Sequence, residues 1–302
     1  MLALWGGLNS VIEKDDEVLC ISNGIFGAEI ALMAKKMGAK VTELIFPPTK
    51  KVDNKKIIET IGQLHPKLVT IVHCETPTGI LNDLSGIGKE THKHGGLFLV
   101  DFVSSAGGVP LNVDEEEIDL GLLGTQKVLS TYADLCMVSI SENAWKRIEK
   151  VAYHGYDALL PFKNAVETKY FPYTHNWNSI CSLKVATEML LQEGLENSWE
   201  RHKKCAEFCR KKVQEMGLEL YPEAIEDNSN TVTAVTGFTT FSDWKTIDTE
   251  LRKFGIILGG SYGEFAGKVF RIGHMGSQAN MELLQDAIEK LEQVVKSLKS
   301  TK

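Results

Sequence analysis

The sequence lacks an excess of positive charge. It contains 33 lysine and arginine residues against 40 aspartate and glutamate residues, so its formal net charge at pH 7 is −7. Proteins that bind nucleic acid or anionic membranes usually present a basic face to them. The acidic balance therefore argues against both classes of partner.

Long apolar runs and targeting signals are also missing. No stretch approaches the roughly 20 apolar residues that a membrane-spanning helix requires. The first residues, MLALWGGLNSVIEKDDE, have neither a basic region nor a small-residue cleavage site, so they do not resemble a secretory signal peptide. The final Ser-Thr-Lys differs from the usual peroxisomal tripeptide. We therefore expect a cytoplasmic protein, with a peroxisomal or mitochondrial location left open.

The six cysteines include no CxxC motif. Cys20, Cys74 and Cys136 lie inside apolar, strand-like runs, so we predict that they are small core residues of a protein from a reducing compartment. Cys205 and Cys209 are four residues apart on an expected helix, with a histidine one turn earlier. We predict helix packing there and no metal, because no fourth ligand is nearby.

The first half of the chain alternates between two kinds of apolar pattern. Strand-like runs lie at 18–22, 41–46, 68–74, 97–101, 120–124 and 135–140, and helical patterns at 26–37, 53–64 and 83–94. Such alternation is typical of an α/β protein with a mostly parallel sheet between helices. With 302 residues and 43% apolar content, the chain can bury one large core and a smaller one.

The pattern changes after residue 154. Residues 155–177 are rich in aromatic and polar residues and predict an irregular crossing segment. Two long helices are expected at 178–193 and 195–216, followed by short strands near 218–221, 231–237, 256–260 and 269–274 and helices near 242–254 and 278–298. We therefore divide the chain into a large domain (1–175), a connecting helix (176–195) and a small C-terminal α+β domain (196–302).

Two charged residues follow the apolar runs of the large domain. Asp101 ends the run LFLVD, and Lys127 follows LGLLGTQ. Because ligands bind at the carboxyl ends of parallel strands, we expect both side chains in one crevice. A carboxylate that keeps a pyridine nitrogen protonated and an amine that forms a Schiff base are what pyridoxal 5'-phosphate requires. The alternatives are a solvated surface lysine and a helix-capping or surface-paired aspartate.

Three further residues are candidates, each with an ordinary alternative. Thr76, in ETPTG, could donate to the phenolic oxygen of the cofactor or belong to a simple loop. Phe26, in NGIFG, could stack on the cofactor ring or be a plain core residue. Arg271, in KVFRIG, could bind a substrate carboxylate or form a buried ion pair.

These motifs together resemble those of class V (fold-type I) aminotransferases, specifically the alanine–glyoxylate and serine–pyruvate group. The resemblance covers nearly the whole chain and rests on NGIFG, ETPTG, LVDFVSSAGG, GTQK, EGLENSW and GKVFRIG. It implies a sheet of the seven-stranded type. It also implies transamination between a small amino acid (alanine or serine) and a small 2-oxo acid (glyoxylate or pyruvate), in a homodimer with shared active sites.

The resemblance also assigns roles to single residues. It implies that Lys127 is the Schiff-base lysine, that Asp101 is the partner of the pyridine nitrogen, and that Arg271 binds the substrate carboxylate. The other positions carried over are Thr76 at the phenolic oxygen, Phe26 and Val103 on the two ring faces, Gln126 at the phosphate, and Thr174 reaching the phosphate in the neighbouring subunit.

The sequence departs from this family at its start. Relatives carry roughly 80 further residues before the point that matches Met1, including a phosphate-binding turn. This difference motivates an alternative, a truncated homologue that is poor in pyridoxal phosphate and acts as a dimerising or binding protein. A lyase or cysteine desulfurase of the same fold is a third reading. It is disfavoured because no cysteine lies on an evident mobile loop.

Overall fold

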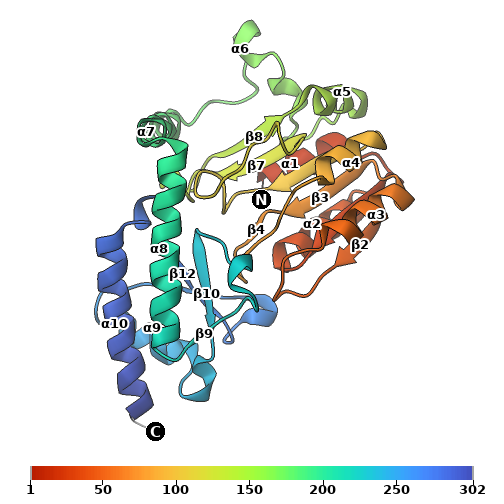
Figure 1. Cartoon of the computed structure of the whole chain (residues 1–302). Helices are drawn as coiled ribbons and strands as arrows, with labels where there is room; N and C mark the ends of the chain where they lie inside the picture. Colours follow the sequence, from red (N-terminus) through yellow and green to blue (C-terminus); the bar gives the residue numbers. More distant parts are fainter. Residues whose placement is uncertain (1, 301–302) are drawn as a thin grey trace.

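The computed structural model describes residues 2–300 and contains a larger and a smaller sheet with helices around them (Figure 1). The larger sheet has the strand order β2-β1-β3-β6-β7-β8. Its strands are β1 Glu17–Ser22, β2 Lys40–Ile45, β3 Leu68–Val72, β6 Leu97–Asp101, β7 Leu120–Gly124 and β8 Cys136–Ile140. All neighbours are parallel except β7 and β8. The expected mostly parallel α/β sheet is confirmed, with six strands among the described residues.

Helices cover both faces of this sheet because its strands are apolar on both sides. On β1, Val18 and Cys20 belong to one core cluster, whereas Leu19 and Ile21 belong to the cluster on the opposite face. Alternate residues of a strand point to opposite faces, so a continuous apolar run needs cover on both. The first face is covered by α1 Leu2–Val11, α2 Ile25–Lys36 and α5 Glu142–Val151, and the second by α3 Asn54–Leu64 and α4 Ile87–Lys93.

The smaller sheet has a core of its own. Its order is β11-β12-β10-β9, from β9 Glu219–Leu220, β10 Val232–Thr236, β11 Gly259–Gly260 and β12 Phe270–Gly273. The helices α8 Leu195–Glu215, α9 Trp244–Arg252 and α10 Met281–Ser300 contribute residues to the same apolar cluster, which includes Phe238 and Phe270. The buried pair Cys205 and Cys209 packs within it. The domain limits at residues 175 and 195 stay a prediction.

Short elements connect these parts. They are the hairpin of β4 Cys74–Glu75 and β5 Ile80–Leu81, helix α6 Ala165–Thr168, and the 3-10 helices η1 Leu160–Phe162, η2 Ile225–Asp227, η3 Phe238–Thr240, η4 Gly263–Phe265 and η5 Gly276–Gln278. The helix α7 Trp177–Glu193 leads from α6 to α8, and α6 projects from the body of the protein (Figure 1). Within residues 2–300, no helix combines the length and apolarity needed to cross a membrane.

One cysteine lies differently from the prediction. Cys136 is exposed, whereas Cys20 and Cys74 are buried. Cys136 begins β8, which is the last strand in the sheet order and has a largely exposed or half-exposed course. An edge strand lacks a neighbour on one side, so an apolar sequence does not guarantee burial there. The prediction that Cys136 is a core residue is therefore wrong.

Candidate active site

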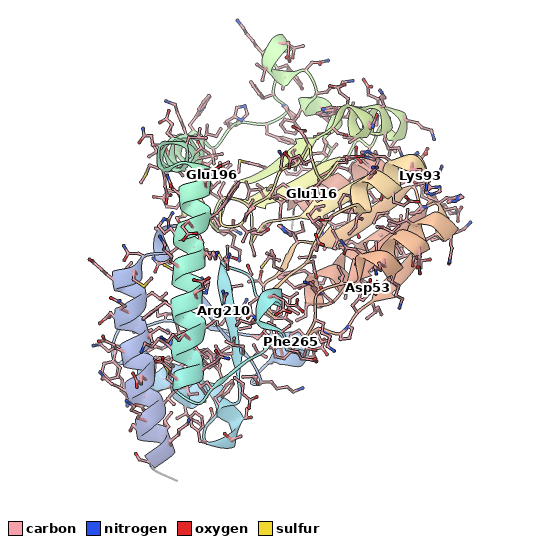
Figure 2. The ribbon with its side chains drawn as sticks, in the orientation of Figure 1. Asp53, Lys93, Glu116, Glu196, Arg210 and Phe265 are labelled. Carbon is pink, nitrogen blue, oxygen red and sulfur yellow. The ribbon has the colours of Figure 1, made fainter. Side chains whose placement is uncertain are left out.

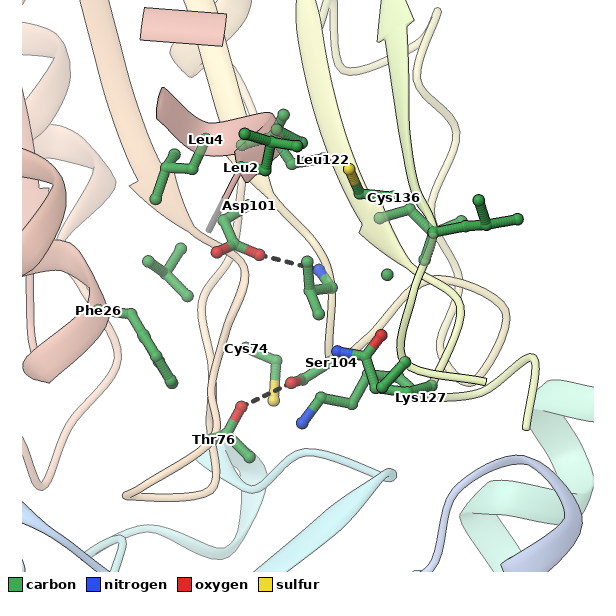
Figure 3. Close-up of a pocket in the computed structure, with 18 of the residues that line it drawn as sticks. Leu2, Leu4, Phe26, Cys74, Thr76, Asp101, Ser104, Leu122, Lys127 and Cys136 are labelled. Carbon is green, nitrogen blue, oxygen red and sulfur yellow. Dashed lines mark hydrogen bonds between the residues drawn. The ribbon is translucent and has the colours of Figure 1, made fainter. Parts of the chain in front are cut away.

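A cavity of about 400 Å³ lies at the carboxyl ends of the strands in the larger sheet (Figure 3). Six of the predicted site residues line it: Phe26, Thr76, Asp101, Val103, Gln126 and Lys127. We call it the Asp101 cavity. Ligand sites of open parallel sheets form at this end of the strands, because the loops that follow them diverge there.

The pairing of β6 with β7 brings Asp101 and Lys127 together. The two strands are parallel neighbours, and Asp101 is in register with Leu122. Lys127 follows β7 in a loop that Thr125 anchors, since its hydroxyl donates to the carbonyl oxygen of Leu135 at 3.1 Å. Neighbouring parallel strands therefore end at one edge with a carboxylate on the first and an amine after the second.

The Asp101 carboxylate forms few polar contacts with the part of the chain that the structure describes. Among residues 2–300 it accepts one hydrogen bond, from the backbone N–H of Val103 at 2.9 Å (Figure 3). Burial raises the pKa of Asp101, and the Val103 bond and the charge of Lys127 oppose that rise. A buried carboxylate is stabilised by a cationic donor. Within residues 2–300 no side chain donates to this carboxylate, so a protonated ring nitrogen could do so.

The Lys127 amine is also short of partners. Within residues 2–300 it forms no hydrogen bond or ion pair, and Figure 3 shows it extending toward the side of the cavity that holds Thr76. Burial lowers the pKa of Lys127, and the positive charge of Arg271 lowers it further. A lowered pKa leaves more of the amine neutral, which is the nucleophilic form.

Phe26 is held at the cavity wall through its backbone. It lies in the first turn of α2, where the buried carboxylate of Glu75 accepts from the N–H groups of Gly27 at 2.8 Å and Phe26 at 3.4 Å. The Glu75 side chain lies close to the backbone just before α2, since a Cβ on Gly24 would lie 2.6 Å from Cδ of Glu75. Burial raises the pKa of Glu75 to about 7. Glu75 was not among the site residues predicted from the sequence.

Thr76 pairs with a second hydroxyl that the sequence analysis also missed. Its Oγ1 lies 2.6 Å from Oγ of Ser104, and both residues line the Asp101 cavity (Figure 3). The carbonyl oxygen of Ser104 accepts from the Thr231 hydroxyl at 2.6 Å, which joins this wall to the region of the smaller sheet. The position of Ser104, three residues after Asp101, is the signal that could have identified it.

A second cavity, of about 570 Å³, meets the first. It is lined by Arg271 and shares Thr76 and Lys127 with the Asp101 cavity, so we call it the Arg271 cavity. Arg271 donates from Nε and Nη2 to the carbonyl oxygen of Gly260 at 3.2 and 2.6 Å. It forms no ion pair with the described residues, so the alternative of a buried ion pair is wrong. Its Nη1–Nη2 edge remains available for a carboxylate.

Thr174 lies away from both cavities. It is exposed in the irregular segment between α6 and α7 and lines neither the Asp101 cavity nor the Arg271 cavity. A single chain therefore does not bring Thr174 to Lys127. Its role across a subunit interface stays a prediction.

The residues of the Asp101 cavity fit pyridoxal phosphate. A flat ring over Phe26 would place its nitrogen toward Asp101, its phenolic oxygen toward the Thr76 hydroxyl and its aldehyde toward Lys127. The first turn of α1, with Leu2, Ala3 and Leu4, also lines the cavity. The first N–H groups of a helix have no partner within it and attract anions.

Comparisons with known proteins agree with this chemistry. The sequence model of the aminotransferase class-V family matches residues 2–287. The alanine–glyoxylate aminotransferase of Callithrix jacchus is 32% identical over 95% of this chain and 72% of its own, and the pyridoxamine–pyruvate transaminase of Mesorhizobium japonicum is 30% identical over 92% and 72%. The crystal structure of the ureidoglycine–glyoxylate aminotransferase from Bacillus subtilis superposes with a TM-score of 0.93, at 30% identity over 98% of this chain and 77% of that one.

Proposed function

This chain belongs to the class V aminotransferase family, and we propose that it transfers the amino group of alanine or serine to glyoxylate or pyruvate with the help of pyridoxal phosphate. One observation carries the proposal: Lys127 lies where the Asp101 cavity and the Arg271 cavity meet. The names of the relatives support the choice of acceptors, since they contain glyoxylate and pyruvate.

The residues of the site divide the work of transamination. Bound pyridoxal phosphate supplies an aldehyde that takes up the amino group and a ring that stabilises negative charge at the substrate α-carbon. Asp101 would hold the ring nitrogen by accepting a hydrogen bond from it. Lys127 would hold the aldehyde end of the cofactor, and its neutral amine is the base in the site that would take the proton from the substrate α-carbon.

Substrate orientation depends on the Arg271 cavity. The free Nη1–Nη2 edge of Arg271 would bind the α-carboxylate with two parallel N–H donors. Thr76, which faces both cavities, would donate to the phenolic oxygen while its Oγ1 accepts a hydrogen bond from the Ser104 hydroxyl, 2.6 Å away. The substrate α-carbon is thereby held beside the Lys127 amine.

The Asp101 and Lys127 side chains distinguish an enzyme from a cofactor-poor binding protein. Such a protein has no need for an unpaired, half-buried amine next to a poorly balanced carboxylate, because both cost stability. The arrangement of Asp101 and Lys127 therefore favours the enzyme.

Absorbance and mass spectrometry of the purified protein test the cofactor. The protein incubated with pyridoxal phosphate should develop a visible absorbance band that borohydride removes, with the added mass retained on the peptide that contains Lys127. Lys127→Ala should abolish both signals, whereas Lys93→Ala, on the exposed surface of α4, should retain them. A colourless wild-type protein that takes up no added cofactor would contradict the proposal.

A panel of substrates tests the reaction. Alanine, serine and glycine are offered as donors, and glyoxylate and pyruvate as acceptors, to the protein loaded with cofactor. We expect turnover for at least one pairing of alanine or serine with one of the acceptors. If the cofactor binds and every pairing is inactive, the substrate assignment is wrong.

We also propose that the active protein is a homodimer. The 17-residue helix α7 has one buried residue, Ser179, although Trp177, Val185, Met189 and Leu191 are apolar and each is more than half exposed. A large exposed apolar helix face is typical of a protein interface. An adjoining groove of about 780 Å³ runs between α7 and residues 128–131, which directly follow Lys127.

A dimer through α7 would place the interface against the Lys127 loop. In that arrangement Thr174, from the segment before α7, could reach the Asp101 cavity of the neighbouring subunit. Sedimentation velocity should give a dimer for the wild type and a monomer for the double change Val185→Glu and Met189→Glu. Leu32→Glu, which alters an exposed apolar residue of α2, is the matched control and should remain dimeric. A monomeric wild type at micromolar concentration would reject this proposal.

A further inference from the structure

We propose that Tyr262 determines substrate specificity: its ring forms the wall that the side chain of the amino acid meets, and it restricts donors to side chains about as small as those of alanine and serine. The inference rests on the proposed function, because it concerns the same site. Neither the sequence motifs nor the two cavities by themselves pointed to this residue.

Tyr262 is tied to the arginine that would bind the substrate carboxylate. It lies two residues after Gly260, whose carbonyl oxygen accepts from Nε and Nη2 of Arg271. The Arg271 Cζ atom lies over the Tyr262 ring, 5.8 Å from its centre. A guanidinium at this distance from an aromatic face is attracted by the ring. The ring and the carbonyl together define where the free edge of Arg271 points.

The same ring contacts the residue on which the cofactor would stack. The rings of Tyr262 and Phe26 are 6.1 Å apart between centres and meet edge to face, at 69°. The next residue, Gly263, has φ of +59°, and a Cβ there would lie 2.9 Å from Cδ1 of Ile25 in α2. Phe265, labelled in Figure 2, belongs to the apolar cluster against which Ile25 packs. The Tyr262 loop is thus fixed against α2.

Tyr262 contacts one residue at each of the two anchors of a bound amino acid. Arg271 would hold its carboxylate, and the cofactor over Phe26 would hold its nitrogen. Its α-carbon then keeps two free substituents, the proton taken by Lys127 and the side chain. Tyr262 contacts both Arg271 and Phe26 and is still 39% exposed, so its ring has a surface that the side chain can meet.

The chemistry of the ring suits small, neutral side chains. Burial raises the pKa of the Tyr262 hydroxyl to about 12, so the residue is uncharged throughout the physiological range. A rigid neutral wall excludes larger side chains by overlap and gives no charge to bind an acidic or basic one. A methyl or hydroxymethyl group needs little room and no counter-charge.

The test measures selectivity without requiring turnover. Affinities of propionate and hexanoate, which are unreactive carboxylates with short and long chains, are measured by calorimetry with and without added pyridoxal phosphate. The wild type should prefer propionate, and Tyr262→Ala should shift the propionate-to-hexanoate affinity ratio by about tenfold toward hexanoate. Tyr262→Phe should retain the wild-type ratio. Tyr221→Ala is the matched control, since Tyr221 packs against Phe265 on the same loop.

Two results would overturn the inference. The first is an affinity ratio in Tyr262→Ala within twofold of the wild-type ratio, including an equal loss of both affinities, which would indicate packing alone. The second is an equal shift in Tyr221→Ala. The two proposals can fail separately. If the proposed function is wrong, the wild type transaminates no donor, whereas the propionate-to-hexanoate affinity ratio still tests the role of Tyr262.

Discussion

Replacing Glu75 with glutamine should remove a pH dependence of stability between about pH 4.5 and pH 7. Burial raises the pKa of this carboxyl from an ordinary 4.5 to about 7, although the N–H groups of Gly27 and Phe26 oppose the rise. In that interval the unfolded chain has lost the Glu75 proton while the folded protein still holds it. Stability from this group is therefore complete below pH 4.5, falls as the pH rises, and is lost above pH 7.

The size of the effect follows from the same pKa values. The pKa of Glu75 differs by about 2.5 between the folded and the unfolded protein. At about 1.36 kcal/mol for each pKa unit, this corresponds to about 3 kcal/mol of unfolding free energy. Denaturant unfolding of the cofactor-free protein at pH 5, 6, 7 and 8 measures it. The difference between wild type and Glu75→Gln cancels every other titrating group, and it should change by roughly this amount across the series.

A matched variant separates this carboxyl from general charge effects. Glu90 on α4 has a lowered pKa, because Lys93 and His94 donate to its carboxylate, so Glu90→Gln should add no pH dependence above pH 5. Parallel stability curves for wild type and Glu75→Gln would refute the argument that burial outweighs the two backbone donors at the start of α2. A lower stability of Glu75→Gln at every pH does not affect this test if the difference between the two curves still changes with pH, since glutamine brings an N–H₂ group without an acceptor.

Other changes give simpler outcomes. Asp101→Asn should leave the cofactor bound but lower kcat/KM by about 100-fold or more in the transamination assay, because the ring nitrogen loses its anionic partner; near wild-type activity would remove Asp101 from its role. Arg271→Ala should raise KM for amino acids and 2-oxo acids together, and unchanged KM values would reject it as the carboxylate-binding group. Cys136→Ser should keep full activity, and a large loss would reopen the desulfurase reading. Phe238→Ala should cost about 3–5 kcal/mol in denaturant unfolding, because its fully buried ring packs on another phenylalanine; a cost below 1 kcal/mol would contradict this.

The elements of the larger sheet could be predicted because each strand is apolar on both faces. The run at 97–101 coincides with β6, and the helix expected at 178–193 begins one residue earlier, at Trp177. Three helices were missed: the four-residue α6, in the segment expected to be irregular, and the ten-residue α1 and α5. In α1, Leu4, Gly6, Gly7 and Leu8 are all buried, so the segment has no polar face to give a helical period. The sequence does contain a start signal for α5, because Ser141 caps the helix by accepting a hydrogen bond from the N–H of Ala144.

The site was predictable where it depends on strand ends and unpredictable where it depends on distant contacts. Asp101 and Lys127 follow adjacent strands, so topology alone brings them together. Glu75 accepts hydrogen bonds from a helix 48 residues earlier in the chain, and Tyr262 contacts Phe26 of α2 and Arg271 of β12. No local pattern reports such contacts. The dimer and the role of Thr174 stay proposals, because they concern a second chain.

The meeting of the two cavities at Thr76 and Lys127 has a consequence for the order of events. An amino acid and its 2-oxo acid product are small enough to enter and leave through the Arg271 cavity, while the larger cofactor would fill the Asp101 cavity. The first product could therefore leave, and the second substrate enter, through the Arg271 cavity without displacing the cofactor that holds the amino group. A protein arranged in this way needs no room for both substrates at once.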